Sequence, residues 1–336
     1  ISALAVIFMR AGALPSPIKL AESELNALKL LGGTVDGVIS ALKFLRGSLT
    51  SLNFEEGQYI WRYKHPTIRD AFAQYVANDV ELLEIYLGGA PLEMLFQEVA
   101  CIDIEMEGLK VIVPESHYPL LINRMESFQR NTWFNQSLFS RFLTKRCNYQ
   151  FLSTYLDKNP DFLENLRVRT SFFLDSDLAI ITKFFEEKLL PEERRLIVAR
   201  SLHELAIEDF DTQFSKDGVK NLLTKVEYSS IQKDVKDKVI NNMESIIEDL
   251  SANYDEESDP EDHFSDLTYS INDYEDIFLD DDKICEQLSV ARDWIEDEIK
   301  EMTKKRIYEP NEVFERENHS VLNHSTERSI FDDVDS

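Results

Sequence analysis

Cysteine and glycine are scarce in this chain of 336 residues, and each shortage excludes a class of site. The three cysteines, Cys101, Cys147 and Cys285, lie far apart and form no CxxC pair. They therefore offer no disulfide framework and no zinc knuckle, and they suit a reducing compartment. The ten glycines form neither a GxGxxG nor a GxxxxGK[ST] pattern, and HExxH and GxSxG are also missing. We expect no catalytic site and no metal site within this segment.

Long apolar runs are missing too. The longest run near the start, Ala3–Met9, ends at Arg10 and is far too short to cross a bilayer. No basic segment precedes it, so it does not have the pattern of a signal peptide. We expect a cytoplasmic protein without a membrane segment. Because Ile1 opens the chain inside an apolar helical pattern, the sequence predicts a fragment whose N-terminal part precedes it.

Positive charge is outnumbered, with 36 Lys and Arg against 63 Asp and Glu and a formal net charge of −27. Sixteen of the acidic residues fall within residues 239–282, which contain no Lys or Arg. Nucleic-acid binders and anionic membranes need basic surfaces, so we expect neither partner. Residues 255–266 and 273–286 lack the central glycine and the regular oxygen spacing of an EF-hand loop. The acidic residues 244–282 remain to be explained. They are either a contact for a basic partner or a solvating connector.

The first 77 residues predict helices and strands in the order of a winged-helix module. Apolar spacing predicts helices over 2–11, 21–31 and 34–48. Alternating aromatic residues around a turn with Gly57 predict a β-hairpin over 52–63. Pro66 suits the first position of a further helix, so His65 is expected at its N-cap.

Beyond residue 77 the pattern is almost wholly helical, apart from one short extended stretch at residues 109–113. We expect an α-helical sensor or scaffold region over 78–250, an acidic flexible segment over 251–283, and a C-terminal helix and tail over 284–336. The predicted fold class is mainly α: a winged-helix module followed by an α-helical bundle or irregular helical-repeat region and an acidic flexible tail.

The candidate site is the strand-to-helix junction at Lys64, His65, Pro66 and Thr67. The first turn of a helix exposes unpaired N–H groups and the positive end of the helix dipole, which together attract phosphate. An imidazole at this place adds a hydrogen bond. Alternatively, His65 only caps the helix and packs against Trp61 or Phe72, and Lys64 points into solvent.

Residues 59–77 (YIWRYKHPTIRDAFAQYVA) and 81–89 (ELLEIYLGG) resemble the winged helix of STAND-type P-loop NTPases, most of all the bacterial novel STAND group of conflict and defence proteins. The terminal IFDDVD at 330–335 is also similar to that group. The resemblance covers about residues 1–100 and the tail. It implies that an upstream domain binds ADP or ATP, and that a winged-helix histidine holds the β-phosphate of ADP in the closed state.

By position this histidine is His65, with Lys64 as an assisting cation, although Lys64-His65-Pro66 replaces the Met-His-Asp triplet common in the family. The resemblance thus implies the regulatory and sensor part of a signalling STAND ATPase in bacterial defence. The expected partners are the upstream NTPase domain, a protein trigger or effector, and further copies of the protein on activation.

Three other functions compete with this one. The first is a non-catalytic helical scaffold for protein interactions with no nucleotide link. The second is a DNA-binding regulator, which is disfavoured because the third helix carries only Lys43 and Arg46 against Asp36. The third is an enzyme within this segment, for which no motif speaks.

Overall fold

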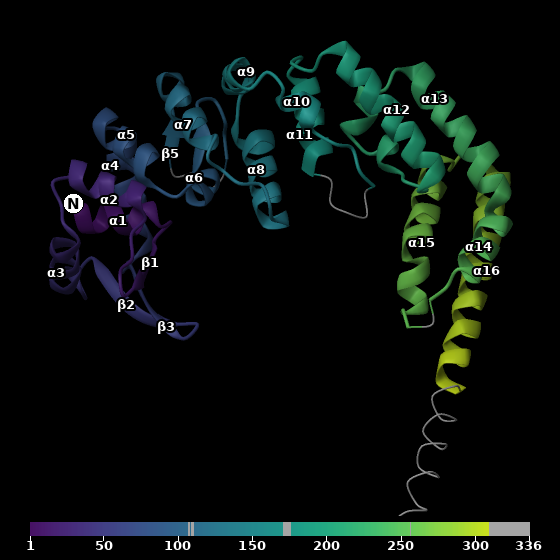
Figure 1. Ribbon diagram of the computed structural model, residues 1–336, viewed down its shortest axis with the longest axis horizontal. Coiled ribbons are helices and arrows are strands. Elements are labelled where there is room, and N and C mark those ends of the chain that lie inside the picture. The colour runs from purple at the N-terminus through teal and green to yellow at the C-terminus, as the bar shows by residue number, and fades with distance from the viewer. Residues whose placement is uncertain (107, 109–110, 171–175, 256, 309–336) are drawn as a thin grey trace, which may run out of the picture. The chain divides into compact units, whose positions relative to one another are not determined.

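The computed structural model describes residues 1–308, apart from 107, 109–110, 171–175 and 256, and the described chain is mainly helical (Figure 1). This confirms the predicted mainly α class. The chain divides into two compact units, one of residues 1–169 and 175–198 and one of residues 170–174 and 199–336. Of the C-terminal helix and tail predicted over 284–336, residues 309–336 lie outside the described residues, and with them the IFDDVD sequence.

The first part of the first unit contains a small three-stranded antiparallel sheet, whose hairpin projects away from the neighbouring helices in Figure 1. The strand order is β1-β3-β2, so that Trp61 in the central strand lies opposite Leu14 on one side and Leu52 on the other. The elements of this part are α1 (Ser2–Met9), β1 (Ala13–Ser16), α2 (Glu22–Leu30), α3 (Val35–Leu45), β2 (Thr50–Glu55), β3 (Gln58–Tyr63) and α4 (Pro66–Ala77).

The predicted hairpin is present, and its loop is tighter than the sequence suggests. Glu56 and Gly57 form a two-residue turn, and both have positive φ, as a type I′ turn requires. The edge strand β1 is not expected from the sequence, because Pro15 and Pro17 there indicate a turn. Proline is tolerated at the edge of a sheet, where a missing N–H donor breaks no ladder hydrogen bond.

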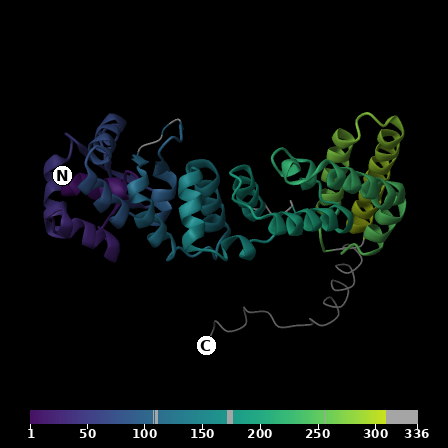
Figure 2. The same ribbon diagram turned by 90° about the horizontal axis from the view of Figure 1, so that it is seen from above.

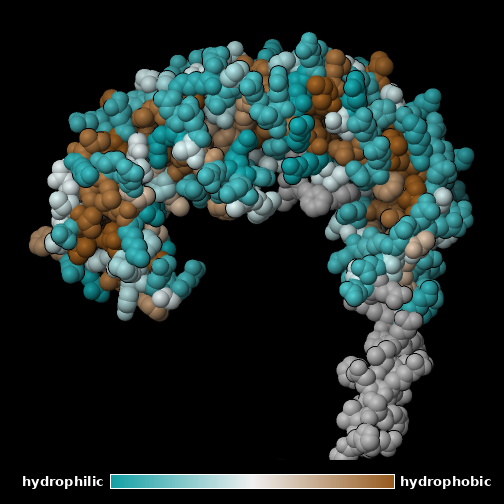
Figure 3. Space-filling view, viewed as in Figure 1, coloured by the Kyte–Doolittle hydropathy of each residue, from teal (hydrophilic) through white to brown (hydrophobic). Residues whose placement is uncertain are grey.

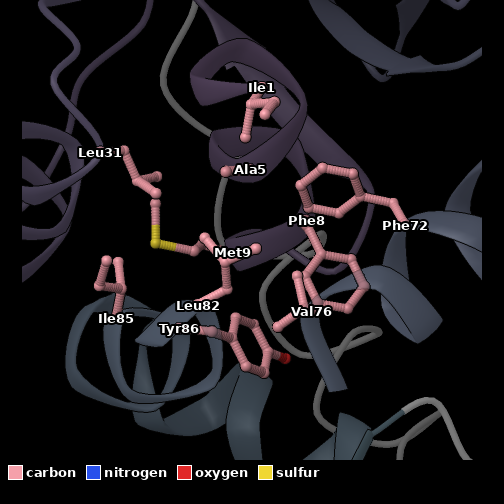
Figure 4. A pocket seen from close by; sticks show the side chains of 10 residues that line it. All are labelled: Ile1, Ala5, Phe8, Met9, Leu31, Phe72, Val76, Leu82, Ile85 and Tyr86. Atoms are coloured by element: carbon pink, nitrogen blue, oxygen red, sulfur yellow. The ribbon is translucent and has the colours of Figure 1, made fainter. Parts of the chain in front are cut away.

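The core of this part forms around α1, which is apolar on nearly every side and has most of its side chains buried. Figure 4 shows Phe8 of α1 facing Phe72 of α4 and Tyr86 of α5 (Val80–Gly89). The ring centroids are 5.5 Å and 4.8 Å from that of Phe8, within the usual range for aromatic pairs. These contacts fix α4 and α5 against the same helix, and only apolar side chains surround the small pocket between them, apart from the Tyr86 hydroxyl.

The rest of the first unit is a series of short helices with one parallel pair of strands, β4 and β5. For residues 109–113 the sequence predicts either one isolated strand or a buried extended link, and the pairing of β5 with β4 is not expected from it. The elements are α6 (Leu92–Glu98), β4 (Val99–Cys101), β5 (Val111–Val113), a 3₁₀ turn (Glu115–His117), α7 (Tyr118–Met125), α8 (Trp133–Arg146), α9 (Tyr149–Lys158), α10 (Phe162–Asn165), α11 (Ser176–Glu186) and the first part of α12 (Glu192–Glu208).

The second unit begins within α12 and is helical throughout its described residues. Its two long helices, α15 and α16, lie side by side (Figure 1 and Figure 2). A single helix is predicted for residues 231–250, but π and 3₁₀ turns interrupt it. The elements are the 3₁₀ turns Gln213–Ser215, Val219–Leu222 and Ile240–Asn242, the π turn Val235–Val239, α13 (Lys225–Asp234), α14 (Met243–Ala252), α15 (Pro260–Ile277) and α16 (Asp282–Tyr308).

The acidic segment 251–283 is not the flexible connector expected from its charge, because 18 of its residues form α15. Phe264, Leu267, Ile271 and Tyr274 recur at spacings of three and four residues and are buried. The acidic side chains lie on the remaining sides of the helix, and much of the surface that this unit presents in Figure 3 is hydrophilic. The prediction of a flexible segment is therefore corrected, because the acidic residues are interspersed with an apolar stripe of helical period.

A substitution in this stripe tests the correction. Ile271→Ala is expected to lower the free energy of unfolding of the second unit by about 2–4 kcal/mol, because it opens a cavity at a side chain that is 1% exposed. Tyr269→Ala on the same helix is the control, since Tyr269 is 66% exposed and its loss should change stability by about 0.5 kcal/mol at most. Equal effects in urea unfolding, followed by circular dichroism, would contradict the packed helix.

Candidate functional site

The candidate site lies where β3 passes into α4, as the sequence predicts. His65 is the N-cap of α4 in an extended backbone conformation, and Pro66 takes the first helical position. The imidazole Nδ1 accepts a hydrogen bond from the Thr67 backbone N–H at 3.3 Å and lies 2.8 Å from Thr67 Oγ1. Both side chains are exposed. The local sequence therefore folds into a helix start whose first free N–H is already satisfied by the histidine itself.

This capping contact orients the imidazole and selects its tautomer. A ring nitrogen that accepts a hydrogen bond carries no proton, so a neutral His65 has its proton on Nε2. No hydrogen bond is made by Nε2 anywhere in the described part of the chain. The exposed imidazole is thus held by Nδ1 while the N–H of Nε2 is available as a donor to an acceptor outside this chain.

Lys64 is adjacent in sequence but is tied elsewhere. Its ammonium donates a hydrogen bond to the carbonyl oxygen of Gly47, in the loop between α3 and β2. Its backbone N–H donates to the Leu49 carbonyl at 2.9 Å, which continues the pairing beyond the end of the strands. The lysine is exposed and adds positive charge near the junction. Its side chain is nevertheless held toward the α3–β2 loop.

The aromatic packing considered as the alternative for His65 does not occur among the described residues. Phe72 is in ring contact with Phe8, Tyr63 and Tyr75, at centroid distances of 5.5, 6.4 and 6.1 Å. Trp61 is buried in the sheet. The capping half of that interpretation is correct, because His65 does cap α4.

Further along α4, Arg69 takes part in a partly buried ion pair beside the buried hydroxyl of Tyr86 on α5, and the sequence gives no sign of either. Arg69 Nη2 is 2.6 Å from Glu98 Oε2, an ion pair that joins α4 to the last residue of α6. The Tyr86 hydroxyl lies buried near both charges and has no hydrogen-bond partner within the described residues. Burial, aided by the charge of Glu98, raises the pKa of Tyr86 far above its ordinary value, so the hydroxyl stays protonated. Contacts of this kind join residues far apart in the chain, and no motif announces them.

The remaining titratable side chains do not assemble into a metal site: within the described ranges, no three His, Cys, Asp or Glu side chains come together as ligands would. His203 Nε2 instead lies within hydrogen-bond distance of Asp234 Oδ2, at 3.0 Å. Lys238, together with His203, holds the pKa of Asp234 below its ordinary value. The cysteines are free thiols, with Cys101 and Cys147 buried and Cys285 partly so.

Comparison with known proteins places no further constraint on the site. No protein-family model, no curated protein and no solved structure matches this chain. Within the residues that the structure describes, none of the helices has the length and apolarity needed to span a bilayer. The function must therefore be argued from the geometry of this chain together with the resemblance in its sequence.

Proposed function

We propose that this chain is the regulatory and sensor part of a signalling STAND ATPase in bacterial defence, in which residues 1–77 form a winged helix that restrains the ADP-bound closed state. The observation that carries the proposal is His65, with Nδ1 engaged in capping and Nε2 available as a donor. The nucleotide, ADP or ATP, is bound mainly by an upstream NTPase domain. The helices of residues 78–250 are the sensor, and their partners are a protein trigger or effector.

The element order supports the winged-helix assignment. Helix, strand, two helices, two strands and a closing helix follow one another, and the three strands form one antiparallel sheet in the order β1-β3-β2. In this arrangement the closing helix α4 begins directly after the hairpin. The histidine is therefore presented by a rigid junction of strand and helix and not by a long loop, as a positioned contact requires.

The residues of this chain fit one contact to a phosphate and not a complete nucleotide site. The Thr67 N–H at the start of α4 is taken by His65 itself, so the imidazole Nε2 is the group that reaches outward. Lys64 is held by Gly47 and contributes charge more than a directed hydrogen bond. When bound by the upstream domain, ADP supplies the phosphate acceptor. His65 then stabilises the closed state by as much as its contact differs between the closed and open states.

The proposal is tested with variants that separate the two roles of His65, the capping of α4 and the donation of a hydrogen bond from Nε2. His65→Asn keeps a good N-cap but removes the Nε2 donor, whereas His65→Ala removes both. In the natural protein that carries this chain, each variant should release a fluorescent ADP analogue about tenfold faster or more. The reason is that a hydrogen bond to a charged group contributes about 1.5–3 kcal/mol. Basal activation should rise in both variants.

Tyr75→Ala is the matched control, because Tyr75 is exposed on the same helix and does not cap it. Unchanged release of ADP from His65→Asn, with wild-type basal activity, would remove His65 from the mechanism. If the natural protein retains no nucleotide at all, the nucleotide link fails as a whole. The helical scaffold for protein interactions then remains as the function.

A further inference from the structure

A polar cleft lies in the first unit, away from the histidine, between the end of α7, the start of α10, and helices α8 and α9. Its volume is about 410 Å³, which is in the range of small-molecule sites. The residues that give it chemical character are Arg130, Tyr155, Lys158, Asn159, Phe139 and Phe162. They come from four different segments, so the cleft exists only in the folded unit.

Arg130 is the central feature of this cleft. Its guanidinium carbon lies 4.9 Å from the ring centroid of Phe139 and 5.5 Å from that of Phe162. Both rings are buried, and the half-buried guanidinium rests on them through cation–π contacts. No ion pair or hydrogen bond of the guanidinium exists within the described chain. A flat guanidinium supported by aromatic rings, with its N–H donors unused, is suited to a planar oxyanion that accepts two parallel hydrogen bonds.

The side chains around Arg130 supply further hydrogen-bond donors, and they also limit the negative charge that a ligand can carry. Burial raises the pKa of Tyr155 to about 12, against the opposing effect of Arg130, so its hydroxyl remains a donor at neutral pH. Lys158 stands at the edge, where its ammonium donates to the Asn123 side chain. Glu126 and Asp161 are exposed and also line the cleft. Their negative charges oppose a dianion such as phosphate and favour a ligand with a single negative charge.

We propose that this cleft binds a small organic monocarboxylate with an apolar body. The carboxylate forms two hydrogen bonds with the Arg130 guanidinium, the Tyr155 hydroxyl supplies a third, and the apolar body covers the half-buried ring of Phe128, which also lines the cleft. This site is separate from the His65 junction and does not depend on the nucleotide proposal. It gives the first unit a ligand of its own, recognised by charge, planarity and apolar contact together.

Benzoate, inorganic phosphate and acetate are the probes for this site, added to the intact chain. The arginine Nε–Hε signals are followed by NMR, with concentrations up to about 10 mM, the range of a weak site. Benzoate should shift the Arg130 signal saturably, acetate should act more weakly because it lacks the apolar body, and phosphate should leave the signal in place. Arg130→Lys keeps the positive charge but loses the two parallel N–H donors of the guanidinium. It should weaken benzoate binding about tenfold, measured by calorimetry.

Arg141→Lys on α8 is the matched control, since Arg141 is exposed and lies outside the cleft, and it should bind benzoate as the wild type does. Tyr155→Phe keeps the ring and should weaken benzoate binding by about threefold to tenfold, as expected for one hydrogen bond. The proposal is overturned if benzoate fails to saturate, if Arg130→Lys and Arg141→Lys bind it equally, or if phosphate binds as tightly as benzoate. Thermal unfolding of each variant verifies that the fold is retained.

Discussion

Arg10→Met is expected to destabilise the first unit by about 3 kcal/mol, because it strands a buried negative charge. Glu24 is 0% exposed, and its carboxylate accepts hydrogen bonds from Arg10 Nε and Nη2, both at 2.5 Å, and from the Ala21 N–H at 2.7 Å. Arg10 follows the end of α1, and Glu24 lies in the first turn of α2. The pair therefore fixes the angle between two helices of the core.

The reverse substitution should do less harm. Glu24→Gln removes the negative charge beside Arg10, but the Arg10 side chain reaches solvent, and the amide oxygen still accepts a hydrogen bond from it. We expect a loss of about 1–2 kcal/mol. Urea unfolding followed by circular dichroism measures both variants. Glu22→Ala, an exposed acidic residue on the same helix, serves as the control. Equal losses from Arg10→Met and Glu24→Gln would show that the burial of Glu24 does not decide the energetics.

Phe142→Ala should lower the free energy of unfolding of the first unit by about 3–5 kcal/mol. Phe142 is 0% exposed and stacks on Phe96 at 4.6 Å between ring centroids, while Phe151 meets it edge-on at 5.7 Å. Removing its ring leaves a cavity between α6, α8 and α9 that the three helices cannot close without breaking their other contacts.

The same helix supplies the comparison for Phe142. Phe134→Ala removes an identical side chain from α8 at a position that is 57% exposed, so it should change stability by about 0.5 kcal/mol at most. Differential scanning calorimetry on the intact chain gives both values. A loss for Phe142→Ala no larger than that of the control would mean that these aromatic rings do not form a tightly packed core.

Local signals in the sequence are sufficient to predict the structure of the strand-to-helix junction that carries His65. The alternation of aromatic residues predicts the hairpin, and the Pro66 position predicts both the helix start and the capping role of His65, all of which the structure bears out. These features depend on a few neighbouring residues and on backbone preferences. The strand β1 escapes prediction because its pairing with β3 comes from a distant segment and overrides the turn preference of its prolines.

Two features could not be predicted from the sequence: helix α15, because its acidic composition suggests disorder, and the cleft around Arg130, because its residues come from different segments of the chain. In α15 the acidic residues suggest disorder by composition, although the buried positions follow a helical period once they are counted separately. The cleft around Arg130 is hidden for a different reason. Its guanidinium rests on Phe139 and Phe162, and only the packing of α8 and α10 brings these three together. Single-sequence patterns contain no information about such a convergence.

The ion pair between Arg69 and Glu98 has a mechanical consequence for the contact that we propose at His65. The ion pair ties α4 to the end of α6, and the rings of Phe72 and Tyr86 pack α4 and α5 against Phe8 of α1, so a tilt of the closing helix would disturb contacts with three other helices. In the proposed role of His65, a displacement of the imidazole would therefore be opposed by contacts that α4 makes with α1, α5 and α6, and it would not be confined to α4.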